Sequence, residues 1–263
     1  MCFAHDASPP DVPRDLLLPP VAGGAAAEAL ELTAADGNRF AAAMTPAAES
    51  RGVGVLVMPD VRGLYPFYTE LTERLASAGH HAIAYDFFGR TAGPGPRDED
   101  FDYWPHVTES TPEHVREDGA TAIAELRDRT GVVEVVVVGF CFGGAQALLA
   151  ATDVELDVDG VVAFYGALDG ERLGIPSPLE LTDRMRVPVL GLYGGADQGI
   201  PVEQVREFDA ALERSIVDHE ITVYDDAPHS FFDRKQDEYA EECEDAWRRT
   251  LAFLERFADA RRV

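Results

Sequence analysis

A single cysteine stands in a frame that suits a nucleophile. Cys141 lies in Gly139–Gly144, which reads Gly-Phe-Cys-Phe-Gly-Gly, after the apolar run Val132–Val138 and before small, helix-favouring residues. Glycines on either side of a nucleophile let the backbone make a sharp strand-to-helix turn that exposes the central side chain. By itself the frame is a weak signal, because a cysteine after a buried strand is more often a small core residue.

Two further residues supply the groups that activate a thiol. A thiol nucleophile needs a base to take its proton and a partner that orients the base. Asp197 follows the apolar stretch Val187–Tyr193 and His229 follows Glu220–Tyr224, so both stand after predicted strands. The order nucleophile, acid, histidine is the order found in α/β hydrolases. We therefore predict a catalytic triad of Cys141, Asp197 and His229, which is far more specific than any one of its parts.

Other candidates for these roles have simpler structural explanations. Asp225 and Asp226 come shortly before His229, and we expect them to cap its loop. Cys243 falls on a helical stripe with Tyr239, Trp247 and Leu254, so core packing explains it better than chemistry. The remaining histidines follow no late strand, and we expect them to have surface roles.

An oxyanion formed during acyl transfer needs backbone donors near the nucleophile. One donor is usually the N–H of the residue after the nucleophile, and another comes from the loop after an earlier strand. Phe142 holds the first position, and Met58–Gly63 follows the first core strand. We predict that Phe142 and Val61 donate their backbone N–H groups, with Arg62 as the alternative to Val61.

The elements that must position these residues are apolar strands alternating with amphipathic helices after Gly52. This alternation predicts βαβ units and a mostly parallel central sheet with helices on both faces. Together with the frame around Cys141 and the order of the triad, it predicts a single-domain α/β-hydrolase fold. The predicted strands are Val53–Met58, His81–Tyr85, Val132–Val138, Gly160–Tyr165, Val187–Tyr193 and Glu220–Tyr224, and the predicted helices are Phe67–Ala78, Pro112–Asp128, Gly144–Ala151, Pro201–Arg214 and Asp237–Phe257. Before them, residues 25–45 predict a β-hairpin at an antiparallel edge.

Three segments fall outside this alternation. Residues 1–24 are rich in proline and predict an extended surface arm, which leaves the hydrolase domain at residues 25–263. Residues 89–111, rich in glycine, proline, acids and aromatics, are too long for a plain connection and predict a lid or substrate loop. Residues 168–186 form a second irregular insert.

The composition is strongly acidic, with 48 Asp and Glu against 22 Lys and Arg and a formal net charge of −26. Such a surface repels nucleic acid and anionic lipid, so we predict neither nucleic-acid nor membrane partners. A halophilic source and a high-GC genome both fit this composition. We expect a small-molecule substrate and a monomer or small homo-oligomer.

The cysteines indicate neither a disulfide scaffold nor a metal site. Cys2, Cys141 and Cys243 cannot all pair with one another, and no two have the short spacing of a zinc site, so we predict no metal. Residues 1–25 lack the basic start and apolar core of a signal peptide, and no apolar run reaches the length of a membrane span. We therefore expect a protein of the reducing cytoplasm.

These residues resemble the dienelactone hydrolase family, the carboxymethylenebutenolidases of the α/β-hydrolase fold. The resemblance spans roughly residues 26–260 and rests on four segments: Gly139–Gly144, Gly195-Ala196-Asp197, Pro228-His229-Ser230-Phe231 and Pro59–Gly63. Cysteine at the nucleophile position is its specific part, since most relatives of the fold use serine. The resemblance implies a Cys-His-Asp triad, no cofactor, and hydrolysis of a cyclic enol ester that carries a carboxylate.

The resemblance also implies roles for residues around the thiol. Asp60 stands where the family has a glutamate that interacts with the thiol until substrate displaces it; alternatively, Asp60 caps its loop or pairs with Arg62. The family holds the substrate carboxylate with two arginines, and Arg90 stands in the place of one. The alternative for Arg90 is a salt bridge with the acids of Asp98–Asp102.

The second family arginine should follow the histidine by four positions, where this chain has Asp233, with Arg234 one residue later. A step of one residue on a helix turns a side chain by about 100°, so Arg234 faces elsewhere if the segment is helical. We keep Arg62 and Arg234 as candidate substrate-binding cations. Tyr103, together with Trp104, is a candidate wall for an apolar substrate pocket, unless both only pin the insert down.

These patterns predict a cysteine-dependent hydrolase of esters or lactones that works through a thioester. One alternative is a general carboxylesterase that needs no substrate carboxylate. The other is a catalytically idle binding protein that uses the same fold.

Overall fold

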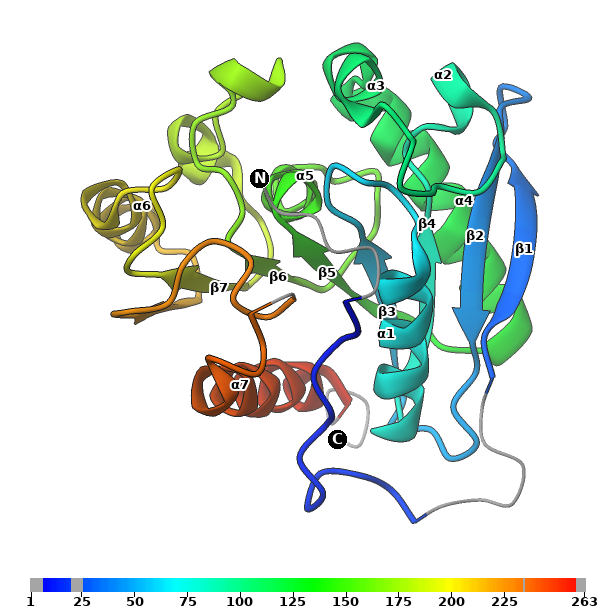
Figure 1. Cartoon of the computed structure of the whole chain (residues 1–263), viewed down its shortest axis with the longest axis horizontal. Helices are drawn as coiled ribbons and strands as arrows, with labels where there is room; N and C mark the ends of the chain where they lie inside the picture. Colours follow the sequence, from blue (N-terminus) through cyan, green and yellow to red (C-terminus); the bar gives the residue numbers. More distant parts are fainter. Residues whose placement is uncertain (1–6, 20–25, 234, 259–263) are drawn as a thin grey trace.

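The computed structural model describes residues 7–19, 26–233 and 235–258, and its centre is one eight-stranded sheet (Figure 1). The strand order is β1-β2-β4-β3-β5-β6-β7-β8. β1 pairs antiparallel with β2, and β2 pairs antiparallel with β4, whereas all other neighbours are parallel. The predicted mostly parallel α/β sheet with an antiparallel hairpin at one edge is therefore confirmed.

The strands follow the sequence pattern closely. Their bounds are β1 Glu28–Thr33, β2 Arg39–Thr45, β3 Val53–Met58, β4 His81–Tyr85, β5 Glu134–Phe140, β6 Gly160–Phe164, β7 Val189–Gly194 and β8 His219–Tyr224. Every residue of β3 and β4 is buried, as is all of β5 after Glu134, because these strands lie in the interior of the sheet with helices on both faces. Each fully buried valine of these runs contributes roughly 1.5–3 kcal/mol.

Helices cover both faces of the sheet, with α1 and α7 on one face and α4 and α5 on the other (Figure 1). Their bounds are α1 Pro66–Ser77, α2 Gly89–Ala92, α3 Tyr103–Glu109, α4 Pro112–Thr130, α5 Phe142–Ala150, α6 Val202–Arg214 and α7 Ala240–Ala258, with short 3-10 turns η1 Glu171–Leu173 and η2 Leu179–Arg184. Small residues in α5 let it pack closely over β5 and β6. None of the helices in the described part of the chain is long and apolar enough to cross a bilayer.

The two inserts contain short helices that the sequence pattern did not predict. Residues 89–111 include α2 and α3, and residues 168–186 include η1 and η2. The inserts meet where the guanidinium of Arg172 lies 5.8 Å from the centre of the Trp104 ring. The buried ion pair between Arg97 and Asp86, 2.6 Å apart, fastens the first insert to the end of β4.

The described part of the N-terminal arm, residues 7–19, packs against α7 and the end of α1 (Figure 1). Trp247 donates its indole N–H to the carbonyl of Pro10 at 3.1 Å, and the Leu18 N–H donates to the Ser77 carbonyl at 3.1 Å. Val12 is buried in the core. The described part of the arm contains a turn at residues 14–17, and part of it is buried rather than lying on the surface as expected.

Candidate active site

Cys141 occupies a strained turn between β5 and α5. Its backbone angles, φ 53° and ψ −110°, lie in a region that residues with a side chain rarely adopt. The turn is held on both sides, because the Cys141 N–H donates to the Phe164 carbonyl and its carbonyl accepts from the Ala145 N–H, each at 3.0 Å. The Cys141 side chain is only partly buried, so a substrate can approach it.

The two glycines that frame the cysteine are required by close backbone contacts. A Cβ at Gly139 would lie 2.1 Å from the Gly143 carbonyl oxygen, and a Cβ at Gly143 would lie 2.1 Å from the carbonyl oxygen of Met58. Both distances are far below van der Waals contact, so any side chain would force the backbone apart. The same contact brings the loop after β3, which begins at Pro59, against the start of α5.

Asp197 and His229 lie together at the carboxyl ends of β7 and β8. The His229 Nδ1 and the Asp197 Oδ2 are 2.6 Å apart, and the other carboxylate oxygen of Asp197 accepts the N–H groups of Gly199 at 2.7 Å and Ile200 at 3.3 Å. Backbone bonds tie the two loops together, including Ala196 N–H to the Ala227 carbonyl at 3.0 Å. Asp197 is thus fixed by its own loop and in turn fixes the imidazole of His229.

Cys141 lies close to His229, since its charge acts on the pKa of the imidazole. Burial by itself would lower the pKa of His229, but the charge of Cys141 and the hydrogen bond that His229 donates to Asp197 outweigh it and raise the pKa to about 11. The imidazole therefore carries a proton at neutral pH in the presence of a Cys141 thiolate. The structure brings His229 into hydrogen-bond contact with Asp197 and places Cys141 near the imidazole, while the catalytic triad itself stays a prediction.

The two predicted oxyanion donors lie on the segments that meet beside Cys141. Phe142 is the first residue of α5, where a backbone N–H has no acceptor within its own helix. Val61 belongs to the loop after β3, and Asp60 shapes that loop by accepting the Arg62 N–H on its Oδ1 at 2.8 Å and the Gly63 N–H on its carbonyl at 3.0 Å. Their role as donors stays a prediction.

Tyr165 is a site residue that the sequence reasoning missed. It directly follows β6, and its ring centre lies 4.9 Å from that of His229. Its φ of 38° is unusual for a residue with a large side chain, and it is buried. The signal for it was its place after a parallel strand, since the carboxyl ends of neighbouring strands meet at one edge of the sheet.

The sequence matches one protein family over most of its length. The model of the Dienelactone hydrolase family matches residues 40–258. A protein of Escherichia coli (strain K12) named "Putative carboxymethylenebutenolidase" is 32% identical over 213 residues, which cover 77% of this chain and 76% of the relative. The chain belongs to the dienelactone hydrolase family.

A second relative and a solved structure agree with this membership. The "Carboxymethylenebutenolidase" of Rhodococcus opacus is 29% identical over 224 residues, covering 78% of this chain and 82% of the relative. The crystal structure of a "Putative Dienelactone Hydrolase" from Klebsiella pneumoniae subsp. pneumoniae has a TM-score of 0.74 at 26% identity, covering 87% of this chain and 98% of that chain. The predicted family and the prediction of a hydrolase are confirmed.

Within this dienelactone hydrolase family member, Asp60 is engaged by an arginine. The Arg62 Nε lies 3.0 Å from each carboxylate oxygen of Asp60, and an ion pair joins the two side chains. This is the alternative that the sequence left open for Asp60, together with capping of its loop. The predicted pairing of Asp60 with the thiol stays a prediction.

Arg62 also binds Asp233, the residue at the position where the resemblance implied an arginine. Asp233 accepts a further hydrogen bond from the Tyr65 hydroxyl at 3.1 Å, and the Arg62 guanidinium lies 3.8 Å from the centre of the Tyr65 ring. We call Asp60, Arg62 and Asp233 the Arg62 cluster. Arg62, which was a candidate substrate-binding cation, is therefore already held by two carboxylates. Arg234 lies outside the described residues.

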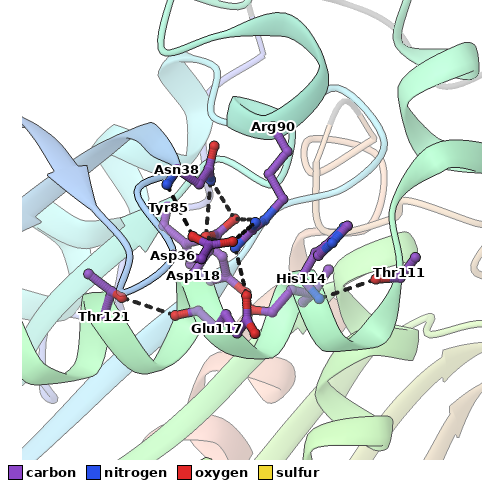
Figure 2. Close-up of polar contacts among 10 residues, drawn as sticks. Asp36, Asn38, Tyr85, Arg90, Thr111, His114, Glu117, Asp118 and Thr121 are labelled. Carbon is purple, nitrogen blue, oxygen red and sulfur yellow. Dashed lines mark hydrogen bonds and ion pairs between the residues drawn. The ribbon is translucent and has the colours of Figure 1, made fainter.

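Arg90 points toward the hairpin and α4, as Figure 2 shows. Its guanidinium pairs with Asp118 at 2.9 Å, with Glu117 at 3.0 Å and with Asp36. The alternative prediction, a salt bridge between Arg90 and the acids of Asp98–Asp102, is thus wrong, because Arg90 turns back over the sheet edge instead of toward the insert. We call Asp36, Arg90, Glu117 and Asp118 the Arg90 cluster, and substrate binding by Arg90 would require breaking it.

Tyr103 and Trp104 open helix α3 in the first insert. Tyr103 is half-buried and packs against the core, whereas Trp104 is exposed and lies under Arg172. Their rings are 6.4 Å apart and nearly perpendicular. The structure therefore gives Trp104 a role in joining the two inserts, and the role of Tyr103 as a pocket wall stays a prediction.

Proposed function

We propose that this chain is a cysteine-dependent hydrolase of esters or lactones that uses Cys141, His229 and Asp197. The observation that carries the proposal is the His229 imidazole, which is hydrogen-bonded to Asp197 and whose pKa is raised by the nearby charge of Cys141, a cysteine on a strained turn. A merely structural cysteine needs neither a positive φ nor an oriented imidazole beside its sulfur. Family membership supports the same class of reaction.

The proposed reaction begins with the Cys141 thiolate, which the protonated imidazole of His229 stabilises. The sulfur forms a bond to the acyl carbon, and the N–H groups of Phe142 and Val61 hold the oxyanion that develops on the carbonyl oxygen. When the oxyanion collapses, the carbon–oxygen bond to the leaving group breaks, and the alkoxide or enolate takes the proton of His229. The acyl group then remains on the sulfur as a thioester.

Water completes the turnover. His229, now neutral, takes a proton from a water molecule as its oxygen attacks the thioester carbonyl. The carbon–sulfur bond breaks, the carboxylic acid product leaves and gives its proton to solvent, and the thiolate and imidazolium pair is restored. A thiolate leaves more readily than an alkoxide or amide nitrogen, so the first step favours activated esters and lactones over amides. The names of the Escherichia coli and Rhodococcus opacus relatives are consistent with a lactone substrate.

The deciding experiment compares Cys141→Ala with the unaltered protein on p-nitrophenyl acetate and dienelactone. We expect kcat/KM to fall by at least about 10³-fold on whichever ester is cleaved, because removal of a triad nucleophile costs factors of this size or more. Cys243→Ala is the matched control, since Cys243 is buried in the core and we expect its loss to leave kcat/KM within about twofold. Wild-type turnover by Cys141→Ala would end the proposal.

Iodoacetamide labelling separates this proposal from an idle binding protein. Burial and nearby acids raise the pKa of Cys243 to about 12, so that thiol should react slowly at pH 7. In a Cys2→Ser background we expect Cys141 to be alkylated much faster than Cys243. Equal rates at the two thiols would favour the idle protein.

A further inference from the structure

A pocket with a volume of about 320 Å³ lies between α4, α5 and the second insert. It stands on the face of the sheet that α4 and α5 cover (Figure 1). Its wall, as far as the structure describes the chain, includes neither the residues of the proposed triad nor the two proposed oxyanion donors. The pocket is therefore distinct from the site of the proposed nucleophile.

Most of the wall of this pocket is apolar. Leu149 and Ala150 line it from α5, Val115 lines it from α4, and Leu181 lines it from the second insert, together with the buried Leu156. The side chain of Ala150 ends at its Cβ, so a larger residue at this position would project into the pocket. An apolar molecule that enters such a pocket gains free energy by leaving water.

One polar side chain is buried in the apolar wall. Gln146 lines the pocket from α5 and is only 2% exposed. Among the described residues, its Nε2 has no hydrogen-bond partner. A buried amide N–H without an acceptor is costly, because it has given up its bonds to water and gained nothing in return. A ligand oxygen that accepts a hydrogen bond from Gln146 removes this cost.

The charged side chains of the wall are the ones that solvent reaches. Glu113 is exposed, and the side chains of Arg116 and Asp153 are 28% and 30% exposed and form an ion pair at 3.6 Å. The buried residues described in the wall carry no charge. A charged group beside Gln146 would therefore be buried without an ion partner there, which is costly. The arrangement favours a neutral ligand.

We propose that this pocket is a second ligand site, which binds a neutral, largely apolar ring compound whose carbonyl oxygen accepts a hydrogen bond from the Gln146 Nε2. An apolar cavity of about 150 Å³ is large enough for benzene, so a pocket of about 320 Å³ holds a ring with substituents. The inference goes beyond the proposed function, because it concerns binding and requires no chemistry at Cys141.

The test uses two probes that differ in one group. 4-Fluoroacetophenone carries a carbonyl group, and 1-ethyl-4-fluorobenzene carries a methylene in its place. The fluorine resonance of each probe is followed by NMR as the full-length protein is added, which gives its Kd. The two probes differ in the cost of leaving water, so the quantity compared between protein variants is the ratio of their Kd values, in which that cost cancels.

Gln146→Met removes the amide and keeps a side chain of similar length. The variant buries no unpaired donor at this position, so we expect it to fold. We expect the Kd of the ketone to rise by roughly tenfold relative to that of the ethyl probe, because the ketone loses its hydrogen bond and the ethyl probe has none to lose. Gln204→Met is the matched control, since Gln204 is half-buried on α6 and is not among the described residues of the wall. Its ratio should stay within about twofold of the wild-type ratio.

Two further variants locate the bound probes. Ala150→Leu places an isobutyl group in the pocket, and we expect it to weaken the binding of both probes by at least about tenfold. Cys141→Ala should leave both Kd values within about twofold, because Cys141 does not belong to the described wall. If Ala150→Leu does not fold, the ratio measured with Gln146→Met still decides.

Four results would overturn the inference. Neither probe binds saturably, which would mean that the pocket holds only solvent. A folded Gln146→Met keeps the wild-type ratio, or a folded Ala150→Leu binds both probes as the wild type does. Binding is lost in Cys141→Ala, which would place the probes in the candidate active site. Ester hydrolysis that persists without Cys141 would overturn the proposed function and leave the binding results as they are.

Discussion

The Arg62 and Arg90 clusters both surround one guanidinium with several carboxylates, but they differ in burial. In the Arg62 cluster the side chains of Asp60 and Asp233 are 7% and 3% exposed. In the Arg90 cluster Asp36 and Glu117 are 41% and 42% exposed, and only Asp118 is buried. Solvent and salt screen the surplus charge of the Arg90 cluster, and they screen that of the Arg62 cluster much less.

The two clusters also serve different parts of the molecule. Figure 2 shows Arg90 joining the hairpin turn to α4, so its cluster fastens the antiparallel edge of the sheet. The Arg62 cluster instead joins the loop after β3 to the loop after β8, and both loops carry proposed catalytic groups. Ion pairs of similar composition therefore fasten the edge of the sheet in one place and join two loops of the candidate site in the other.

The largest effect on stability should come from Arg62→Gln. This change leaves two carboxylates buried without their cation, and breaking a buried ion pair from one side costs about 3–5 kcal/mol. We expect a loss of this size in the free energy of unfolding, measured by urea denaturation. Arg248→Gln is the control, because the partners of Arg248, Asp15 and Glu244, are exposed and the midpoint should not change. An Arg62→Gln protein as stable as the wild type would contradict the expected contribution of the Arg62 cluster to stability.

Arg90→Gln should have a smaller effect. Two of its carboxylate partners are hydrated, and the buried Asp118 keeps the side-chain amide of Asn38, 3.1 Å away. We expect the free energy of unfolding to fall by on the order of 1–2 kcal/mol in the same assay. We also expect kcat/KM on p-nitrophenyl acetate to stay within about twofold. A selective loss of activity on an ester that carries a carboxylate would instead restore Arg90 as a substrate-binding residue.

The smallest effect should be a pH dependence that the two clusters share. Burial raises the pKa of both Asp233 and Asp118 above the ordinary value of 3.8. The folded state then binds these protons more readily than the unfolded state, so their contribution to stability grows as the pH falls and is complete below about 3.8. The wild type should therefore gain stability on acidification relative to Asp233→Asn, and likewise relative to Asp118→Asn.

Urea denaturation between neutral pH and pH 4 checks this expectation. His80, for which a surface role was expected, is instead buried, and its pKa is lowered to about 4, chiefly by desolvation and then by Arg51, so it destabilises the folded state on acidification. That contribution is common to the wild type and both variants, and it cancels in the differences. Differences that stay constant with pH would mean that the two aspartates titrate alike in the folded and unfolded protein.

The sheet was predictable because its pattern is local. β-Branched runs such as Val132–Val138 indicate strands buried on both faces, and the predicted bounds of β3 and β4 match the structure. The short helices of the inserts were missed because they have too few turns for an apolar period to show, and α2 has only four residues. The partial burial of the arm was missed because a proline-rich segment carries no periodic pattern either.

The candidate site was likewise predictable from the sequence only in part. The sequence by itself determined the identities of Cys141, Asp197 and His229 and their places after strands, and parallel strands bring such ends to one edge of a sheet. Tyr165 stands at the same edge, but an aromatic residue after a strand is too common to single out.

Only the tertiary structure decided how the charges pair. Arg62 and Asp233 are 171 residues apart, and the chain offers 48 acids for its arginines. An ion pair depends on where long side chains end in space, which no local pattern of residues encodes. The sequence therefore placed the proposed nucleophile, and the fold determined that Arg62 is already held by two acids.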